Sequence, residues 1–235
     1  MDKKIRSITI SQFDYFIRNV NDEELDIQGH PHHFSEFDQE GRVLKEIRYN
    51  RHGDFEERFE YGYDQSGNLI RESYYPEENE LAEEKIFEHS ESGQLLRVFK
   101  NYQDGSVDTT TCEYDGSGQL VKKTTTTDEG EVEQMETFKW DNGMLAGHEI
   151  VNGEGEILSG TDEVPANPNQ TRIVHNEKDQ VISEEELDEN GEVYMTVNRT
   201  YDEAGRADEV EVFIDGRGQS FSRHYFLKYG YTFFD

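Results

Sequence analysis

Glycines recur at a nearly constant spacing along most of this chain, and no other feature of the sequence constrains its fold as strongly. The intervals are mostly twelve to fourteen residues, and an Asp, Asn or Glu commonly lies within three positions before each glycine. Asp side chains can bond the backbone two residues on, and Gly adopts the positive φ that a tight turn needs. We therefore predict turns at Gly41, Gly53, Gly67, Gly93, Gly105, Gly118, Gly130, Gly143, Gly155, Gly191, Gly205 and Gly218, with Gly29 as an upstream start of the pattern.

The segments between these glycines alternate apolar and polar residues. Val43, Ile47 and Tyr49 share one parity, and Phe59 shares its parity with Tyr61. A period of two over about eight residues indicates half-buried strands. We predict an all-β fold, a repetitive antiparallel meander of about sixteen strands in an elongated, twisted or curled and largely single-layer sheet. Only the segment 77–88 allows a helical turn.

Aromatic–Asp pairs form a second register with twice the period. They occur at positions 37–38, 63–64, 114–115, 140–141 and 201–202, with degenerate copies at 89–90 and 175–176. The repeating unit is therefore a two-strand hairpin of about 25 residues, and one longer step locates an insertion. The predicted organisation is as follows: N-terminal strands at 1–36, repeat hairpins at 37–158, an insertion loop at 159–171, further hairpins at 172–220 and an aromatic cap at 221–235.

The composition limits how thick the protein can be. Hydrophobic residues make up only 32% of the chain, and 53 Asp and Glu face 23 Lys and Arg, a formal net charge of −30. Such a balance usually predicts disorder, but 14 Phe and 13 Tyr with only 4 Pro favour a folded chain. A repeat in which each unit touches only its neighbours needs little core. Strand spacing does not distinguish between a curled ribbon, a flattened sandwich and a closed barrel. The scarce apolar residues favour the ribbon.

Two segments carry a family resemblance. Residues 63–69 (YDQSGNL) and 114–120 (YDGSGQL) resemble the Tyr-Asp-x-x-Gly-x-Leu core of Rhs/YD-repeat proteins, and residues 201–207 (YDEAGRA) are similar but end in Ala207. The resemblance covers roughly residues 37–220. It implies β-hairpin repeats that wind as a continuous strip, which in that family often forms part of large secreted toxins.

The most metal-like cluster is formed by His30, His32 and His33, because His30 and His32 are expected on one strand face and imidazole suits Zn²⁺ or Ni²⁺. No cysteine or patterned carboxylate completes a tetrahedral set, so a surface turn beside Pro31 is the favoured interpretation. The Asp-rich turns do not match an EF-hand and are interpreted as turn formers rather than Ca²⁺ sites. We expect no metal and no cofactor.

Catalysis is not expected from this sequence. Its single cysteine, Cys112, is placed mid-strand, where burial would make the thiol inert. No Gly-x-Ser-x-Gly elbow or His-Glu-x-x-His helix occurs. The N-terminus lacks a signal-peptide pattern and no apolar run is long enough to cross a membrane. The expected location is therefore the cytoplasm, with secretion by a signal-less route left open.

The C-terminal segment is rich in aromatics. We interpret it as a terminal strand pair that caps the sheet, and the alternative is an interaction patch, since aromatics contribute disproportionately to binding energy. The residues of that candidate patch are Tyr225, Phe226, Tyr229, Tyr231, Phe233 and Phe234.

The predicted function is protein binding through a broad acidic β-surface. Charge complementarity would steer a basic protein partner onto it, whereas direct contact with nucleic-acid phosphates is disfavoured. The resemblance adds one version of this role, an immunity-type or antitoxin-type protein that neutralises a basic toxin. The alternative is a structural or surface repeat protein that contacts carbohydrate through Tyr side chains and Trp140. The oligomeric state stays open.

Overall fold

The computed structural model describes residues 3–19, 24–161, 170–188, 190–216 and 222–235. Within these ranges the chain forms seventeen β-strands and no α-helix, which confirms the predicted all-β class. The helical turn allowed at 77–88 is wrong. Glu77 and Glu80 form an isolated antiparallel bridge instead, and a strand follows them. No helix in the described ranges has the length and hydropathy needed to span a bilayer.

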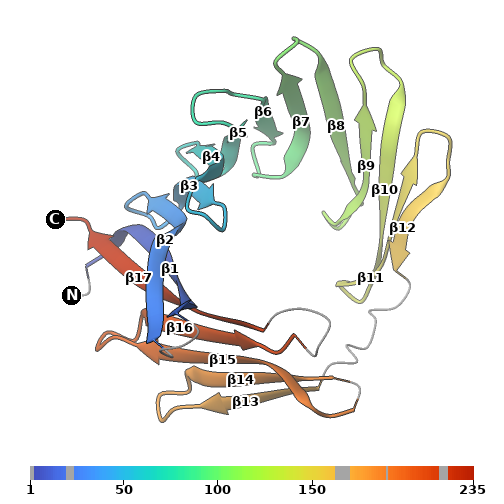
Figure 1. Cartoon of the computed structure of the whole chain (residues 1–235). Helices are drawn as coiled ribbons and strands as arrows, with labels where there is room; N and C mark the ends of the chain where they lie inside the picture. The colour runs from blue at the N-terminus through green and yellow to red at the C-terminus, as the bar shows by residue number, and fades with distance from the viewer. Residues whose placement is uncertain (1–2, 20–23, 162–169, 189, 217–221) are drawn as a thin grey trace. The chain divides into compact units, whose positions relative to one another are not determined.

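The chain divides into two compact units, of which unit 1 comprises Met1–Glu56 and Ala166–Asp235. Its strands pair antiparallel in the order β13–β14–β15–β16–β17–β1–β2–β3, as Figure 1 shows. Their bounds are β13 (Gln170–His175), β14 (Val181–Leu187), β15 (Val193–Tyr201), β16 (Ala207–Ile214), β17 (Arg223–Phe233), β1 (Ile5–Asn19), β2 (Glu24–Phe37) and β3 (Val43–Tyr49).

The C-terminal strand is an interior strand of unit 1, and its interpretation as a terminal cap is corrected. β17 pairs on one side with β16 and on the other with β1, where Ile5 lies opposite Phe233 and Phe13 opposite Phe226. The first and last strands therefore meet inside one sheet. A meander that pairs only strands adjacent in sequence does not contain this contact.

Unit 2 comprises Glu57–Pro165 and keeps chain order throughout. Each strand pairs antiparallel with the next (Figure 1). The strands are β4 (Phe55–Tyr63), β5 (Leu69–Tyr75), β6 (Glu83–His89), β7 (Leu95–Tyr102), β8 (Val107–Tyr114), β9 (Leu120–Thr126), β10 (Val132–Asp141), β11 (Met144–Asn152) and β12 (Ile157–Thr161).

Ten of the eleven turns with a positive-φ glycine repeat one geometry, and the two-residue turn at Asn142 and Gly143 differs. At Asp64, the backbone N–H donates to the Asn68 carbonyl at 3.0 Å and the Gly67 N–H donates to the Asp64 carbonyl at 3.1 Å. The Asp64 carboxylate accepts the backbone N–H groups of Ser66 and Asn68 at 2.8 and 2.9 Å. Gly67 has a φ of 90°, which an L-residue adopts only with strain. The hydrogen bonds that Asp64 accepts, that of the Asn68 side chain first, lower the pKa of its carboxyl.

Positive φ confirms the predicted turns at Gly41, Gly53, Gly67, Gly93, Gly105, Gly118, Gly130, Gly143, Gly155, Gly191 and Gly205. Gly218 lies outside the described residues. One further turn uses Asp179, with a φ of 62°, in the position that glycine takes elsewhere. Asp tolerates this conformation better than most residues. Because that turn has no glycine, the glycine spacing does not predict it.

Gly29 does not begin the turn series, so that part of the prediction is wrong. It lies within β2 opposite Phe13 of β1, and a Cβ at position 29 would lie 2.5 Å from the Phe13 ring. The glycine therefore leaves room for a cross-strand aromatic ring. β1 and β2 have 15 and 14 residues, which makes this hairpin longer than the repeat predicts.

The aromatic–Asp register also has a structural cause. The Tyr114 hydroxyl donates to the Leu95 carbonyl at 2.8 Å, and the Tyr201 hydroxyl donates to the Val181 carbonyl at 2.7 Å. Each bond ties the end of a strand to the beginning of the strand before it, while the following Asp shapes the turn. At Tyr114 and Tyr201 the aromatic–Asp pair therefore closes a hairpin.

Few side chains are fully buried. Leu187 is 1% exposed, and the other buried apolar residues of the described ranges are Cys112, Val197, Val212 and Phe226. Such a small set agrees with the low hydrophobic content. Strand pairing and turn hydrogen bonds, rather than a thick interior, hold each unit together.

Candidate binding surface

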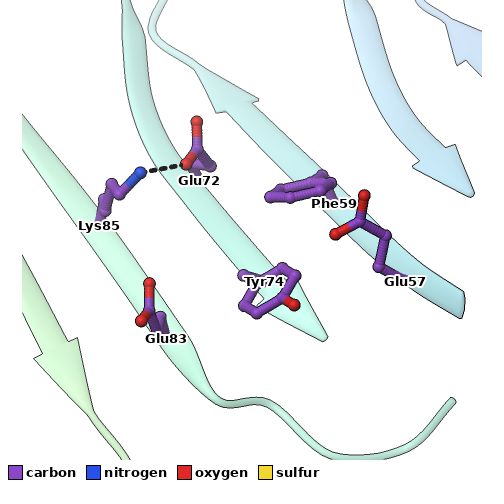
Figure 2. Close-up of a pocket in the computed structure, with 6 residues that line it drawn as sticks. All are labelled: Glu57, Phe59, Glu72, Tyr74, Glu83 and Lys85. Atoms are coloured by element: carbon purple, nitrogen blue, oxygen red, sulfur yellow. Dashed lines mark hydrogen bonds and ion pairs between the residues drawn. The ribbon is translucent and has the colours of Figure 1, made fainter. Parts of the chain in front are cut away.

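A groove lies on one face of β4, β5 and β6 in unit 2, and Figure 2 shows the six side chains that line it. The cross-strand register gathers them, because Phe59 pairs with Tyr74, Glu72 with Lys85 and Tyr74 with Glu83. Residues paired across strands point to the same side of a sheet. The lining residues are Glu57, Phe59, Glu72, Tyr74, Glu83 and Lys85.

Two aromatic rings form the apolar part of the groove. The ring centroids of Phe59 and Tyr74 lie 5.0 Å apart at an interplanar angle of 32°. Tyr61 extends the aromatic row, with its ring 6.5 Å from Phe59. All three residues are half-buried. The groove therefore keeps accessible ring surface, which attracts cations through the electron-rich π face.

Carboxylates surround the rings. Lys85 Nζ lies 2.7 Å from Glu72 Oε1, and Lys100 Nζ of β7 lies 3.0 Å from Glu83 Oε1. Burial alone would lower the pKa of Lys100, but hydrogen bonds to Glu83 and Tyr102 outweigh it and raise that pKa. Three carboxylates and one ammonium line the groove, so its own charge is negative.

The size of the groove limits its ligands. Its volume is about 240 Å³, below the ~300–1,000 Å³ of typical small-molecule sites. It fits one side chain better than a complete metabolite. Aromatic surface with negative charge at its rim suits a Lys or Arg side chain, which can lie on the rings and share or replace the lysine contacts of Glu72 and Glu83.

The histidines proposed as weak metal ligands have other partners. His30 Nε2 lies 2.9 Å from Asp14 Oδ2 of β1, and His33 Nε2 lies 2.8 Å from the Ser35 hydroxyl. The strand register shifts between His33 and Pro31, so His32 lies in a β-bulge. Burial lowers the pKa of His32, and repulsion from the neighbouring histidines lowers it further. Across the part of the chain that the structure describes, no group of three or more His, Cys, Asp or Glu side chains could hold a metal ion.

The C-terminal aromatics do not form one patch. Tyr225, Tyr229 and Tyr231 pair with Asp14, Ile10 and Ile8 of β1 and point to one face of unit 1. Phe226 points to the other face, where it is buried and its ring stacks on Phe13 at 4.8 Å. The strand alternation thus separates residues that are adjacent in sequence.

The remaining members of that set, Phe233 and Phe234, lie at the end of β17. Arg206 lies over the Phe233 ring, with its guanidinium carbon 4.7 Å from the centroid. The Phe234 N–H donates to the Lys4 carbonyl at 3.0 Å. Both residues are half-buried and contribute to the junction of the first and last strands.

The contacts of Cys112 and Trp140 indicate structural roles for both residues. Cys112 lies mid-strand in β8 and is buried, as predicted, and burial raises the pKa of its thiol. Trp140 is 37% exposed, but its indole N–H donates to the Leu120 carbonyl at 2.7 Å. It closes a hairpin as the motif tyrosines do, which leaves only its ring surface for a ligand.

Sequence reasoning missed the groove. The alternation of β4 does place Phe59 and Tyr61 on one face, but the groove also needs the register of β4, β5 and β6. Two turns set that register, and one of them, around the Glu77–Glu80 bridge, has no glycine. The signal available was the density of aromatic and acidic residues in 55–85.

Comparisons with known proteins give only distant likenesses. No family model matches the chain, and no curated protein matches it. A porin-like protein from Bacteroides uniformis is 10% identical, over 98% of this chain and 99% of its own, with a TM-score of 0.41. A porin-like protein from Bacteroides vulgatus is 9% identical over the same shares, with a TM-score of 0.24.

A structure of TcdB2-TccC3 is 15% identical over 78% of this chain, with a TM-score of 0.29. This chain spans only 12% of the length of that one. Likenesses this distant carry no argument about family or function. The β-hairpin repeat rests on the chain's own strands and turns, and the relationship to Rhs/YD-repeat proteins stays a prediction.

Proposed function

We propose that this chain is a non-catalytic binding protein whose acidic β-surface holds a basic protein partner. The observation that carries the proposal is the groove on β4, β5 and β6, where Glu57, Glu72 and Glu83 surround Phe59 and Tyr74. A Lys or Arg side chain of the partner would occupy it. The net charge of −30 would raise the association rate by long-range attraction.

A finer version of this role is that of an immunity-type protein whose partner is a basic toxin. It rests on the resemblance of the repeat motifs and on the charge. The alternative, a surface repeat protein that binds carbohydrate, has in its favour the exposed ring of Trp140. The two proposals predict different responses to salt, because only a charged partner is strongly screened.

The first experiment is capture from native lysate at low ionic strength, elution with salt, and mass-spectrometric identification of the eluted proteins. The captured protein is then titrated against the full chain at several salt concentrations. We expect a basic protein whose affinity falls as salt rises. Affinity that is independent of salt, or binding to neutral glycans on an array with no protein partner, would overturn the proposal.

A pair of variants tests the groove itself. Phe59→Leu with Tyr74→Leu removes both π faces while the residues stay apolar, and cation–π contacts contribute roughly 0.5–2 kcal/mol. We expect the double variant to bind about three to thirty times more weakly. The control is Phe99→Leu, because Phe99 pairs with Ile86 and faces the other side of the sheet. Equal affinity of the double variant and the control would place the partner elsewhere.

A further inference from the structure

A second cavity lies in unit 1, between the beginning of β1 and the turn after β2. Its volume is about 490 Å³, within the range of small-molecule sites. The residues that line it are Lys3, Lys4, Ile5, Ile8, Phe37, Gln39, Glu40 and Gly41. It is separate from the groove of unit 2, and of the repeat motifs it includes only Phe37 and Gly41.

The apolar floor of this cavity results from a bulge in β1. Ile5 pairs with Phe233 and Ile8 with Tyr231, and the register shifts between Ile5 and Ser7. Without that shift, Ile5 and Ile8 would point to opposite faces, because strand residues alternate. The extra residue brings both isoleucines to one face, where Phe37 of β2 joins them.

Two lysines at the rim have no carboxylate partner among the described residues. Lys4 Nζ donates to the Gln39 carbonyl, and Lys3 makes no ion pair with any residue that the structure describes. The nearby carboxylate of Glu40 is occupied by Arg42, whose Nη2 lies 3.2 Å away. Unpaired cations are notable in a chain with more than twice as many acidic as basic residues.

Three other cations of the same unit are paired with carboxylates. Arg42 Nε lies 2.6 Å from Asp38, Arg206 Nη2 lies 2.6 Å from Asp202, and Lys228 Nζ lies 3.5 Å from Glu209. The two rim lysines are therefore available to an anion from solution. The field of a chain with a net charge of −30 repels anions, and the repulsion grows with ligand charge. A single negative charge on an apolar body suits the cavity best.

We propose that this cavity binds a monocarboxylate with an unbranched apolar tail, of the size of a medium-chain fatty acid. The carboxylate lies between Lys3 and Lys4, and the tail lies on Ile5, Ile8 and Phe37. This site is independent of the basic-partner role, because no residue of the groove takes part in it.

The test is calorimetric titration of the full chain with hexanoate, octanoate and decanoate, and with decan-1-ol, all below their micelle or solubility limits. Burial of each methylene strengthens binding by up to about fourfold. We expect saturable binding of decanoate at one site, with affinity rising along the series, and weaker binding of the uncharged alcohol. Absence of saturable binding, or equal affinity for decanoate and decan-1-ol, would overturn the proposal.

The variant Lys3→Gln with Lys4→Gln tests the charged rim without disturbing the apolar floor. Two exposed charge contacts contribute modestly, so we expect decanoate to bind about three to ten times more weakly and decan-1-ol to bind as before. The matched control is Lys139→Gln on β10, an exposed lysine of unit 2 that lines neither cavity. The same decanoate affinity in the double variant and in the control would refute the role of the lysines.

Discussion

Replacing Gly105 by alanine isolates the conformational role of the turn glycines. Gly105 has a φ of 89°, and a Cβ there would meet no atom within 4 Å. A steric clash is therefore excluded, and the cost is that of a left-handed alanine, about 1–2 kcal/mol. Reduced freedom of the unfolded chain offsets part of it, about 0.4–1 kcal/mol. We expect a net destabilisation of about 1 kcal/mol.

The matched control is Gly116→Ala. Gly116 also lies in a turn of unit 2 with open space around its Cβ position, but its φ is not positive. Here only the effect on the unfolded chain remains, so this variant should be neutral or slightly more stable. The two substitutions are chemically identical, but only Gly105→Ala should destabilise the protein.

Urea unfolding followed by tryptophan fluorescence measures this difference. Trp140 is the single tryptophan of the chain and lies on β10, so it reports on unit 2. With a urea dependence of about 1–3 kcal/mol per molar, the Gly105→Ala midpoint should fall by about 0.3–1 M. Equal midpoints for the two variants would refute the argument that positive φ, rather than glycine itself, is what these turns require.

Three further predictions concern strand packing, hairpin closure and pH. Gly29→Ala should destabilise unit 1 by about 1–3 kcal/mol in thermal unfolding, because the Phe13 ring must move; an unchanged melting temperature would contradict this packing. Tyr201→Phe should cost about 0.5–1.5 kcal/mol in the same assay through one lost hydrogen bond, and no loss would show that the bond is not formed. Because the folded state lowers the pKa of Asp64, this carboxylate stabilises the protein at pH values above its ordinary pKa near 4. That stabilisation is lost as the pH falls through the lowered pKa. Asp64→Asn keeps an oxygen that accepts the turn hydrogen bonds, so its stability in urea should fall less steeply between pH 5 and 2. The same pH profile as the unchanged chain would contradict a stabilising role of the Asp64 charge.

The sequence predicts local structure well in this chain because its turns are encoded locally. A positive-φ glycine and an Asp or Asn three residues before it suffice to form one hairpin end, so the positions follow from spacing. Asp179 shows the limit of this prediction, because it adopts the left-handed conformation in a turn that has no glycine at that position. Gly29 shows the converse, since a glycine can also serve a cross-strand ring.

Non-local features could not be predicted in the same way. Nothing in the spacing indicates that β1 pairs with β17, because that contact joins residues more than two hundred positions apart. The groove depends on registers across three strands. The C-terminal aromatics are adjacent in sequence, but the pleat separates Tyr225 from Phe226. These features arise from pairing geometry, which a count of residue types does not contain.

Most of the excess negative charge does not stabilise the fold. Strand pairing uses many of the basic residues directly, as in the pairs Glu72–Lys85, Glu136–Lys123 and Glu209–Lys228. With 53 acidic and 23 basic residues, most carboxylates have no such partner to take, and their mutual repulsion opposes the compact state. Added salt screens that repulsion with a Debye length of about 10 Å at 0.1 M.

Salt should therefore act on stability and on binding with opposite signs. Between about 0.02 and 0.5 M NaCl, we expect the urea midpoint of unfolding to rise, because the excess carboxylates repel one another less. Over the same range the affinity for a basic partner should fall, because its attraction to them is screened as well. If stability and affinity fell together, the surface charges would be pairing within the fold instead of remaining available to a partner, and the case for an acidic binding surface would fail.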